Sequence, residues 1–310
     1  RSKTRARARA GRRLPLLPRN SVLGIFGPTA SGKTAVAEAI AERVPAGIVS
    51  ADSAAVYRDL PILTAASERP TLLAGFLGLE EEISVGEYQR LAHEAVDALL
   101  ADGRTPIVVG GTGLYFRAAV AELSLPPPPA PGERERWEGL YDRVGGAAAH
   151  ALLGERDPAA AAHVHPNDRR RVVRALELAD AGASLRPAES ELWSERTRHP
   201  TLVVGLSAPA DALDRRIEAR ARAMFERGVE EEVRRALERQ PSATAAKVMG
   251  LREVAELPRE EALDAIVRSN RRLARYQRKW MRRIPGIVMI DADRAVGEVA
   301  DAILEVARAG

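Results

Sequence analysis

The segment that decides the fold is Gly27-Pro28-Thr29-Ala30-Ser31-Gly32-Lys33-Thr34, which fits the pattern Gly-x4-Gly-Lys-Ser/Thr. A short apolar run at residues 21–26 predicts a buried strand before it, and apolar side chains at helical spacing predict a helix over residues 33–44. A glycine-rich loop between a strand and a helix indicates a phosphate-binding loop, because backbone N–H groups and the helix N-terminus face one anion. In such a loop Lys33 reaches the terminal phosphates, and the Thr34 hydroxyl is placed to ligate Mg²⁺.

Outward from this loop, strand and helix patterns alternate along the chain. Further short apolar runs predict strands at residues 47–50, 106–109, 201–206 and 287–290. Helical spacing predicts helices at residues 86–102, 211–238, 259–283 and 295–308. Strands that alternate with helices favour a parallel α/β sheet.

A run of four prolines at residues 126–129 interrupts this alternation, and only helical patterns follow it up to about residue 197. We therefore expect a P-loop NTPase-like parallel sheet flanked by helices, built from residues 20–121 and 200–310. An all-helical domain at residues 122–199 is inserted into it.

Charge and composition narrow the class of protein. Residues 1–19 carry eight basic residues and no acid, so the net charge of +4 leaves a mildly acidic remainder. Such a tail can bind nucleic acid by counterion release, act as a disordered solubilising extension, or serve as a transit peptide. The absence of cysteine excludes disulfides, thiolate catalysis and thiolate-held metals. No apolar run approaches the ~18 residues of a membrane span, so we expect a cytoplasmic protein.

Asp52 follows the predicted strand at residues 47–50 and should lie near the phosphate loop, since ligands bind beyond the carboxyl ends of parallel strands. Three roles are open to it on spacing alone. It could hold Mg²⁺ through water, act as a general base, or cap the following turn.

Further segments carry recognisable patterns: Asp52-Ser53-Ala54-Ala55-Val56-Tyr57, Gly110-Gly111-Thr112-Gly113-Leu114-Tyr115, His165-Pro166-Asn167-Asp168, Arg216-Ile217-Glu218-Ala219-Arg220 and Gly250-Leu251-Arg252-Glu253. Together with the phosphate loop and in this order, they resemble the tRNA dimethylallyltransferase (tRNA isopentenyltransferase, or IPP transferase) family. The resemblance covers roughly residues 20–290. The chain departs from the family pattern at Ala55, Ala66, Leu251 and Tyr276, where the family usually has Gln, Lys, an aromatic residue and Arg.

The resemblance implies a reaction. A dimethylallyl group moves from dimethylallyl diphosphate to N6 of the adenosine 3′-adjacent to the anticodon of tRNA, giving N6-isopentenyladenosine. It implies that residues 27–34 bind the diphosphate rather than ATP, that Thr34 ligates Mg²⁺, and that one chain suffices, so we expect a monomer. The implied catalytic residues are Asp52 as general base, Thr29 and Arg220.

The resemblance also implies where tRNA binds. The inserted helical domain would bind the anticodon stem-loop. The implied tRNA-binding residues are Asp52, Ser53, Ala54, Ala55, Thr112, Arg134, Arg170, Arg171, Arg174, Lys247, Gly250 and Arg252. Residues 268–283 add eight basic side chains with no acid among them, which favours phosphate contact over a simple solvated helix face.

Arg216 and Arg220 are four residues apart and share one helix face. We expect Arg220 to bind pyrophosphate, and Arg216 to form surface ion pairs with Asp214 and Glu218. Two other classes of function remain open: a P-loop kinase that uses ATP on a small metabolite, and an RNA-binding protein of the same fold with impaired catalysis.

Overall fold

The computed structural model describes residues 18, 20–125, 129–185 and 191–309. The basic segment 1–19 lies outside the described residues except for Pro18, as do three of the four consecutive prolines. Within the described residues the chain forms two compact units: one ends at Glu122 and resumes at Glu195, and the other is Leu123–Ser194.

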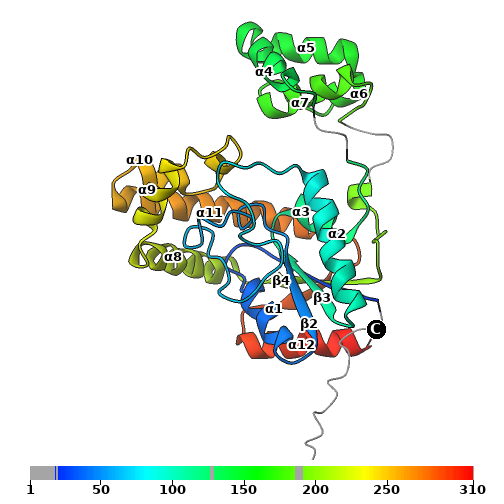
Figure 1. Ribbon diagram of the computed structural model, residues 1–310, viewed down its shortest axis with the longest axis vertical. Coiled ribbons are helices and arrows are strands. Elements are labelled where there is room, and N and C mark those ends of the chain that lie inside the picture. The colour runs from blue at the N-terminus through cyan, green and yellow to red at the C-terminus, as the bar shows by residue number, and fades with distance from the viewer. Residues whose placement is uncertain (1–17, 19, 126–128, 186–190, 310) are drawn as a thin grey trace, which may run out of the picture. The chain divides into compact units, whose positions relative to one another are not determined.

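The first unit contains a five-stranded parallel sheet, drawn in Figure 1. Its strands are β1 Val22–Phe26, β2 Ala46–Ser50, β3 Thr105–Gly110, β4 Thr201–Ser207 and β5 Val288–Asp291, in the order β2-β3-β1-β4-β5. The central strands are buried from end to end, as expected for parallel strands with helices on both faces. The expected α/β class is thus confirmed.

Helices cover the two faces of this sheet. On one face α1 Lys33–Ala41 and α12 Val296–Ala309 pack against side chains such as Leu23 and Ile25. On the other face lie α2 Val85–Ala101 and α3 Gly113–Val120, where the rings of Phe26 and Phe116 meet edge to face with centroids 5.2 Å apart. Because Leu23 and Ile25 alternate with Phe26 along β1, both faces of the strand bury apolar area.

The ends of β1 and β3 form the crevice that positions the site. The helix after β1 covers one face of the sheet and the helix after β3 covers the other, which defines the switch point where open α/β sheets bind ligands. The two strand ends approach closely: a Cβ on Gly111 would lie 2.9 Å from the Gly27 carbonyl oxygen. Only glycine fits at residue 111 without moving the phosphate loop.

The structure corrects the expected single helix over residues 211–238. The chain instead forms α8 Ala210–Glu226 and α9 Val229–Glu238. Gly228 separates them with φ 86°, a left-handed conformation that ends a helix and favours glycine. The break directs Val229 and Val233 of α9 into the core. Beyond them, α10 Leu251–Glu256 leads into the long helix α11 Arg259–Met281, which lies beside α8 (Figure 1).

The second unit is all-helical and has its own core. It contains α4 Glu133–Val144, α5 Gly146–Arg156, α6 Pro158–Ala161, α7 Arg169–Asp180 and the short 3-10 helix η1 Glu191–Trp193. Trp137 is buried against Leu153 and Leu176, and the guanidinium groups of Arg136 and Arg156 lie 4.7 and 5.0 Å from its ring centroid. A buried tryptophan in contact with two cations anchors the unit.

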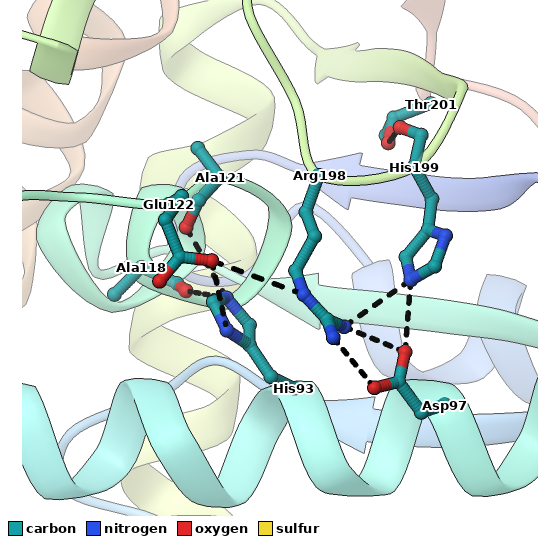
Figure 2. Close-up of polar contacts among 8 residues, drawn as sticks. All are labelled: His93, Asp97, Ala118, Ala121, Glu122, Arg198, His199 and Thr201. Carbon is teal, nitrogen blue, oxygen red and sulfur yellow. Dashed lines mark hydrogen bonds and ion pairs between the residues drawn. The ribbon is translucent and has the colours of Figure 1, made fainter.

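A polar network joins α2 to the segment that enters β4 (Figure 2). Asp97 accepts hydrogen bonds from Arg198 Nη1 and Nη2 at 2.6 and 2.7 Å and lies 2.8 Å from His199 Nε2. Arg198 Nε also lies 3.8 Å from Glu122, which is 3.7 Å from His93 Nδ1. The bidentate hydrogen bonding from Arg198 holds the pKa of Asp97 at about 2.

In the described part of the chain, no helix has the length and apolar character that a membrane span requires.

We predict that Asp97→Asn lowers the free energy of unfolding at pH 7 by about 1 kcal/mol or less, because the Asp97 side chain is 43% exposed. The pKa of Asp97 is lower in the folded chain than its ordinary value of 3.8. The ion pair therefore stabilises the fold above about pH 4, and this stabilisation is lost as pH falls toward 2.

Urea unfolding of wild type and variant between pH 7 and pH 2.5 measures this difference. Asp102→Asn, at the exposed end of the same helix, is the matched control. A difference between wild type and Asp97→Asn that stays constant across this pH range would contradict the assignment.

Candidate active site

The phosphate loop adopts the geometry that anion binding requires. Gly32, the N-cap of α1, has φ 84°, and Ala30 has φ 62°, so the backbone curls between β1 and the helix. Lys33 folds back over the loop, and its Nζ donates a hydrogen bond to the Pro28 carbonyl at 2.7 Å. The N-terminus of α1, which is the positive end of its helix dipole, thus faces a partly enclosed space.

Two cations and one carboxylate set the electrostatics of this space. Burial lowers the pKa of Lys33 to about 8, while Asp52 opposes the shift and Arg220 adds to it. Burial also lowers the pKa of Arg220, again opposed by Asp52. The single negative charge of Asp52 does not neutralise the two positive charges of Lys33 and Arg220. A polyanionic ligand would reduce the repulsion between these two cations.

Two of the three side-chain nitrogens of Arg220 of α8 donate hydrogen bonds, and the third has no partner. Its Nη1 donates to Thr29 Oγ1 at 3.3 Å and its Nη2 to the Thr64 carbonyl at 3.2 Å. Its Nε is buried without a hydrogen-bond partner, as is the hydroxyl of Ser31 in the phosphate loop. Buried donors that lack partners are rare in folded proteins, and phosphate oxygens would satisfy both.

Helix α11 holds the phosphate loop in place through uncharged side chains. The backbone N–H of Thr29 donates to Gln277 Oε1 at 2.7 Å, and Thr29 Oγ1 donates to Asn270 Oδ1 at 3.5 Å. The sequence analysis missed both residues. The available signal was that they lie seven residues apart on the apolar face of a helix whose opposite face is basic.

Asp52 stands at the end of β2 and lines the same cavity as Lys33 and Thr34. Its Oδ1 accepts a hydrogen bond from the Ala54 N–H at 2.9 Å, so the turn-capping role considered from the sequence is present. The backbone N–H of Ser53 donates a hydrogen bond to Thr112 Oγ1 at 3.3 Å. The structure thus brings Asp52, Ser53 and Thr112 together at the ends of β2 and β3.

The cavity has a volume of about 160 Å³ and a lining of mixed character. Its polar and charged lining includes Thr29, Lys33, Thr34, Asp52 and Arg220. Its apolar lining includes Leu63, Met224, Val248, Met249, Ile266 and Leu273. A ligand that combines an anionic group with a short apolar group matches this lining.

Glu232 of α9 supports the wall of the cavity, and the sequence analysis missed it. Its carboxylate is buried and accepts hydrogen bonds from the N–H groups of Ile62 and Leu63 at 2.7 and 2.8 Å. Burial raises its pKa, although these two donors oppose the shift. Glu232 therefore fixes the turn that carries Leu63 into the cavity and presents the Thr64 carbonyl to Arg220.

Three of the predicted tRNA-binding residues lie at or just before the N-terminus of α10. Gly250 has φ 94°, and a Cβ there would lie 2.8 Å from Leu63 Cδ1, at the wall of the cavity. Lys247 is exposed, and Arg252 forms an ion pair with Glu256 at 2.8 Å.

The other predicted tRNA contacts lie in the helical unit. Arg134 and Arg174 both pair with the buried carboxylate of Glu177, each at 2.9 Å. Burial would raise the pKa of Glu177, but these two guanidinium groups hold it below its ordinary value. Arg170 and Arg171 are exposed. Contact of these four arginines with tRNA stays a prediction.

The expected ion pairs of Arg216 were wrong. Arg216 Nη2 contacts Asp293 at 2.8 Å, and Nη1 donates to the Ala292 carbonyl at 3.2 Å. Asp214 instead lies 3.5 Å from Arg271 of α11, and Glu218 pairs with Arg222 of its own helix at 2.9 Å. For Arg216, partners from a distant part of the chain therefore replace the expected neighbours on the same helix.

The donor set fits a divalent cation bound together with a phosphate ligand. Mg²⁺ prefers oxygen ligands, keeps several waters, and binds through one or two carboxylates plus substrate phosphates. The cavity offers the Thr34 hydroxyl and the Asp52 carboxylate. Among the described residues no group of three or more His, Cys, Asp or Glu side chains could hold a metal alone.

The fold and the cavity define a phosphate-loop protein of the parallel α/β class, whose loop lies in a cavity with both polar and apolar lining. The family model described as IPP transferase matches residues 55–284. The tRNA dimethylallyltransferase of Salinispora tropica is 37% identical over 93% of this chain and 93% of that protein, and that of Anaeromyxobacter dehalogenans is 41% identical over 86% and 93%. The chain belongs to the IPP transferase family.

Solved structures agree with this assignment. The full-length tRNA isopentenylpyrophosphate transferase from Bacillus halodurans has a TM-score of 0.65 and 29% identity, covering 94% of this chain and 98% of that chain. A eukaryotic dimethylallyltransferase acting on tRNA has a TM-score of 0.72 at 22% identity, covering 88% and 74%, and shares the fold. The resemblance seen in the sequence is therefore confirmed.

We predict that Glu232→Ala weakens the binding of inorganic pyrophosphate about tenfold, because the freed turn no longer holds the carbonyl that orients Arg220. Titration calorimetry measures the dissociation constant. Glu231→Ala is the matched control, since Glu231 is exposed and pairs only with arginines of its own helix. Wild-type affinity in a folded Glu232→Ala variant would contradict the positioning role.

Proposed function

We propose that this protein transfers a dimethylallyl group from dimethylallyl diphosphate to N6 of the adenosine 3′-adjacent to the anticodon in tRNA. The relatives named above are tRNA dimethylallyltransferases, and the chain spans most of their length. The observation that carries the proposal is a single cavity lined by Lys33, Asp52 and Arg220 together with apolar side chains.

The phosphate loop, Lys33 and Arg220 bind the diphosphate in this proposal. As the bond between donor C1 and the diphosphate oxygen breaks, negative charge develops on the leaving pyrophosphate. Fixed cations and backbone N–H groups aimed at that charge stabilise the transition state more than the ground state. Thr29 contributes by orienting Arg220, to which its hydroxyl is hydrogen-bonded.

Asp52 acts as the general base. The exocyclic amine of adenine is a poor nucleophile because its lone pair is delocalised into the ring. A carboxylate within hydrogen-bond reach orients the amine and accepts its proton as the bond from N6 to donor C1 forms. The products are the prenylated base, pyrophosphate and a protonated Asp52. Mg²⁺, bound by Thr34 and the diphosphate, would supply further charge neutralisation of the leaving group.

The tRNA approaches along α11. Arg268, Arg272, Arg275 and Lys279 are exposed and fall on one face of this helix, with the exposed ring of Tyr276 beside them. The opposite face of the same helix carries Asn270 and Gln277 to the phosphate loop. Phosphate contacts on one face would position an RNA loop whose target base is flipped into the cavity. The predicted residues of the helical unit would add contacts to the anticodon stem.

Transfer of labelled dimethylallyl groups to unmodified tRNA, with Mg²⁺ and without ATP, tests the proposed function. We expect label on the tRNA with the wild-type protein. Asp52→Asn should lower kcat by roughly 10² to 10⁴ because it removes the base, with a much smaller change in tRNA affinity. Glu68→Gln is the control, because Glu68 is an exposed acid outside the cavity lining.

The outcomes separate the classes of function considered. Tight tRNA binding without label would indicate an RNA-binding protein with impaired catalysis. ATP turnover without tRNA would indicate a small-molecule kinase. Near-wild-type kcat in Asp52→Asn would remove Asp52 from the role of base.

We predict that Arg275→Ala and Lys279→Ala each reduce the salt dependence of tRNA binding by about 1 in the slope of log K against log salt concentration, since each removes one phosphate contact. Filter binding at several salt concentrations measures the slope. Arg234→Ala is the control, because Arg234 lies on α9 and pairs with Glu231 and Glu238. Unchanged slopes in both α11 variants would place the tRNA elsewhere.

A further inference from the structure

We propose that Tyr276 of α11 is a stacking surface for an unpaired base of the RNA acceptor. The inference rests on the proposed function and concerns a base that is recognised outside the cavity. Of the aromatic residues in the described part of the chain, Tyr276 alone is exposed, with an exposed fraction of 55%. The face of an exposed ring can stack on any base, so such a side chain suits single-stranded RNA.

The neighbours of Tyr276 carry the charge that a nucleic acid requires. Arg272 precedes it by four residues and Lys279 follows it by three, so both lie beside the ring on the helix surface. Both are exposed, and neither forms an ion pair with another of the described residues, whereas Arg271 contacts Asp214 of α8 at 3.5 Å. An exposed ring among cations that have no acidic partner matches a ligand with both bases and phosphates.

The same face is unsuited to an apolar protein partner. Every residue of α11 is described, and none of its other large apolar side chains is exposed. Interfaces between proteins need a contiguous apolar patch, and their cores are depleted of charged residues. One ring surrounded by basic side chains therefore favours RNA as the occupant.

Contacts with other side chains hold the ring in place. The rings of Tyr276 and Trp280 meet edge to face, with centroids 6.4 Å apart. Trp280 in turn packs against the start of α3, where a Cβ on Gly113 would lie 2.0 Å from its Cε3 atom. A ring that is already held by its neighbours loses little conformational freedom when a base stacks on it.

The ring is also close to the catalytic site along the chain and through its contacts. Gln277, the next residue of α11, accepts a hydrogen bond from the Thr29 N–H of the phosphate loop. Thr112, next to the glycine that Trp280 contacts, accepts one from the N–H of Ser53, beside the proposed general base. A base that is flipped into the site leaves its neighbour without a stacking partner, and a ring near the site replaces part of that stacking.

Residue 276 is one of the positions at which this chain departs from the pattern of its family, which usually has Arg there. Arginine carries a charge that binds phosphate, whereas tyrosine supplies a ring and no charge. Counterions are released when a cation neutralises a phosphate. Stacking on Tyr276 should therefore add affinity for RNA without adding to the salt dependence of binding.

Binding of unmodified tRNA at several salt concentrations tests the proposal. We expect Tyr276→Ala to raise the dissociation constant roughly 5- to 30-fold, in the lower part of the range for one stacked base, and to leave the salt slope unchanged. Tyr276→Phe keeps the ring and should bind as tightly as the wild type, whereas Tyr276→Arg should steepen the slope by about 1. Met289→Ala, which truncates a comparably exposed apolar side chain on β5, is the matched control.

A second measurement separates a stacked base from a structural effect on α11. In an RNA hairpin that carries the anticodon loop, each unpaired base is replaced in turn by an abasic site. At one position the affinity lost by the wild type should equal that lost in Tyr276→Ala, and the two changes together should cost no more than either alone. The affinity for inorganic pyrophosphate should stay that of the wild type, because Tyr276 does not line the cavity.

Wild-type affinity for tRNA in a folded Tyr276→Ala variant would overturn the inference. A shallower salt slope in that variant would overturn it too, since the lost contacts would then be with phosphates. Additive losses at every abasic position, or weaker binding of pyrophosphate, would assign the ring to support of the fold instead. If the wild-type protein neither binds tRNA nor transfers the dimethylallyl label to it, the proposed function itself fails.

Discussion

The hydrogen bond from the Thr29 backbone to Gln277 is the contact on which the site depends. Gln277 is buried, and its Nε2 lies 2.4 Å from the position that a Cβ on Gly111 would take. One amide side chain therefore joins the phosphate loop, the end of β3 and α11. Because α11 also carries Ile266 of the cavity lining and an exposed basic face, the positions of the phosphate loop, the cavity and this basic face are set together.

The site holds more positive than negative charge, and an anionic ligand would neutralise the excess. Lys33 and Arg220 both have lowered pKa values because burial outweighs the attraction of Asp52. Leaving such charges near one another costs stability in the free protein. The fold tolerates this cost because Thr29, the Thr64 carbonyl and the Pro28 carbonyl each accept a hydrogen bond from one of the two cations. Cations fixed in advance need little reorganisation when a diphosphate binds.

Local pattern predicted the sheet and the phosphate loop, because strand, loop and helix are adjacent in sequence there. It failed where the determining partner is distant. Gly228 breaks an otherwise continuous helical pattern, and Arg216 pairs with Asp293 rather than with its helical neighbours. Gln277 and Glu232 were missed for the same reason: each acts on backbone N–H groups of a segment more than a hundred residues away. No local spacing encodes such a contact.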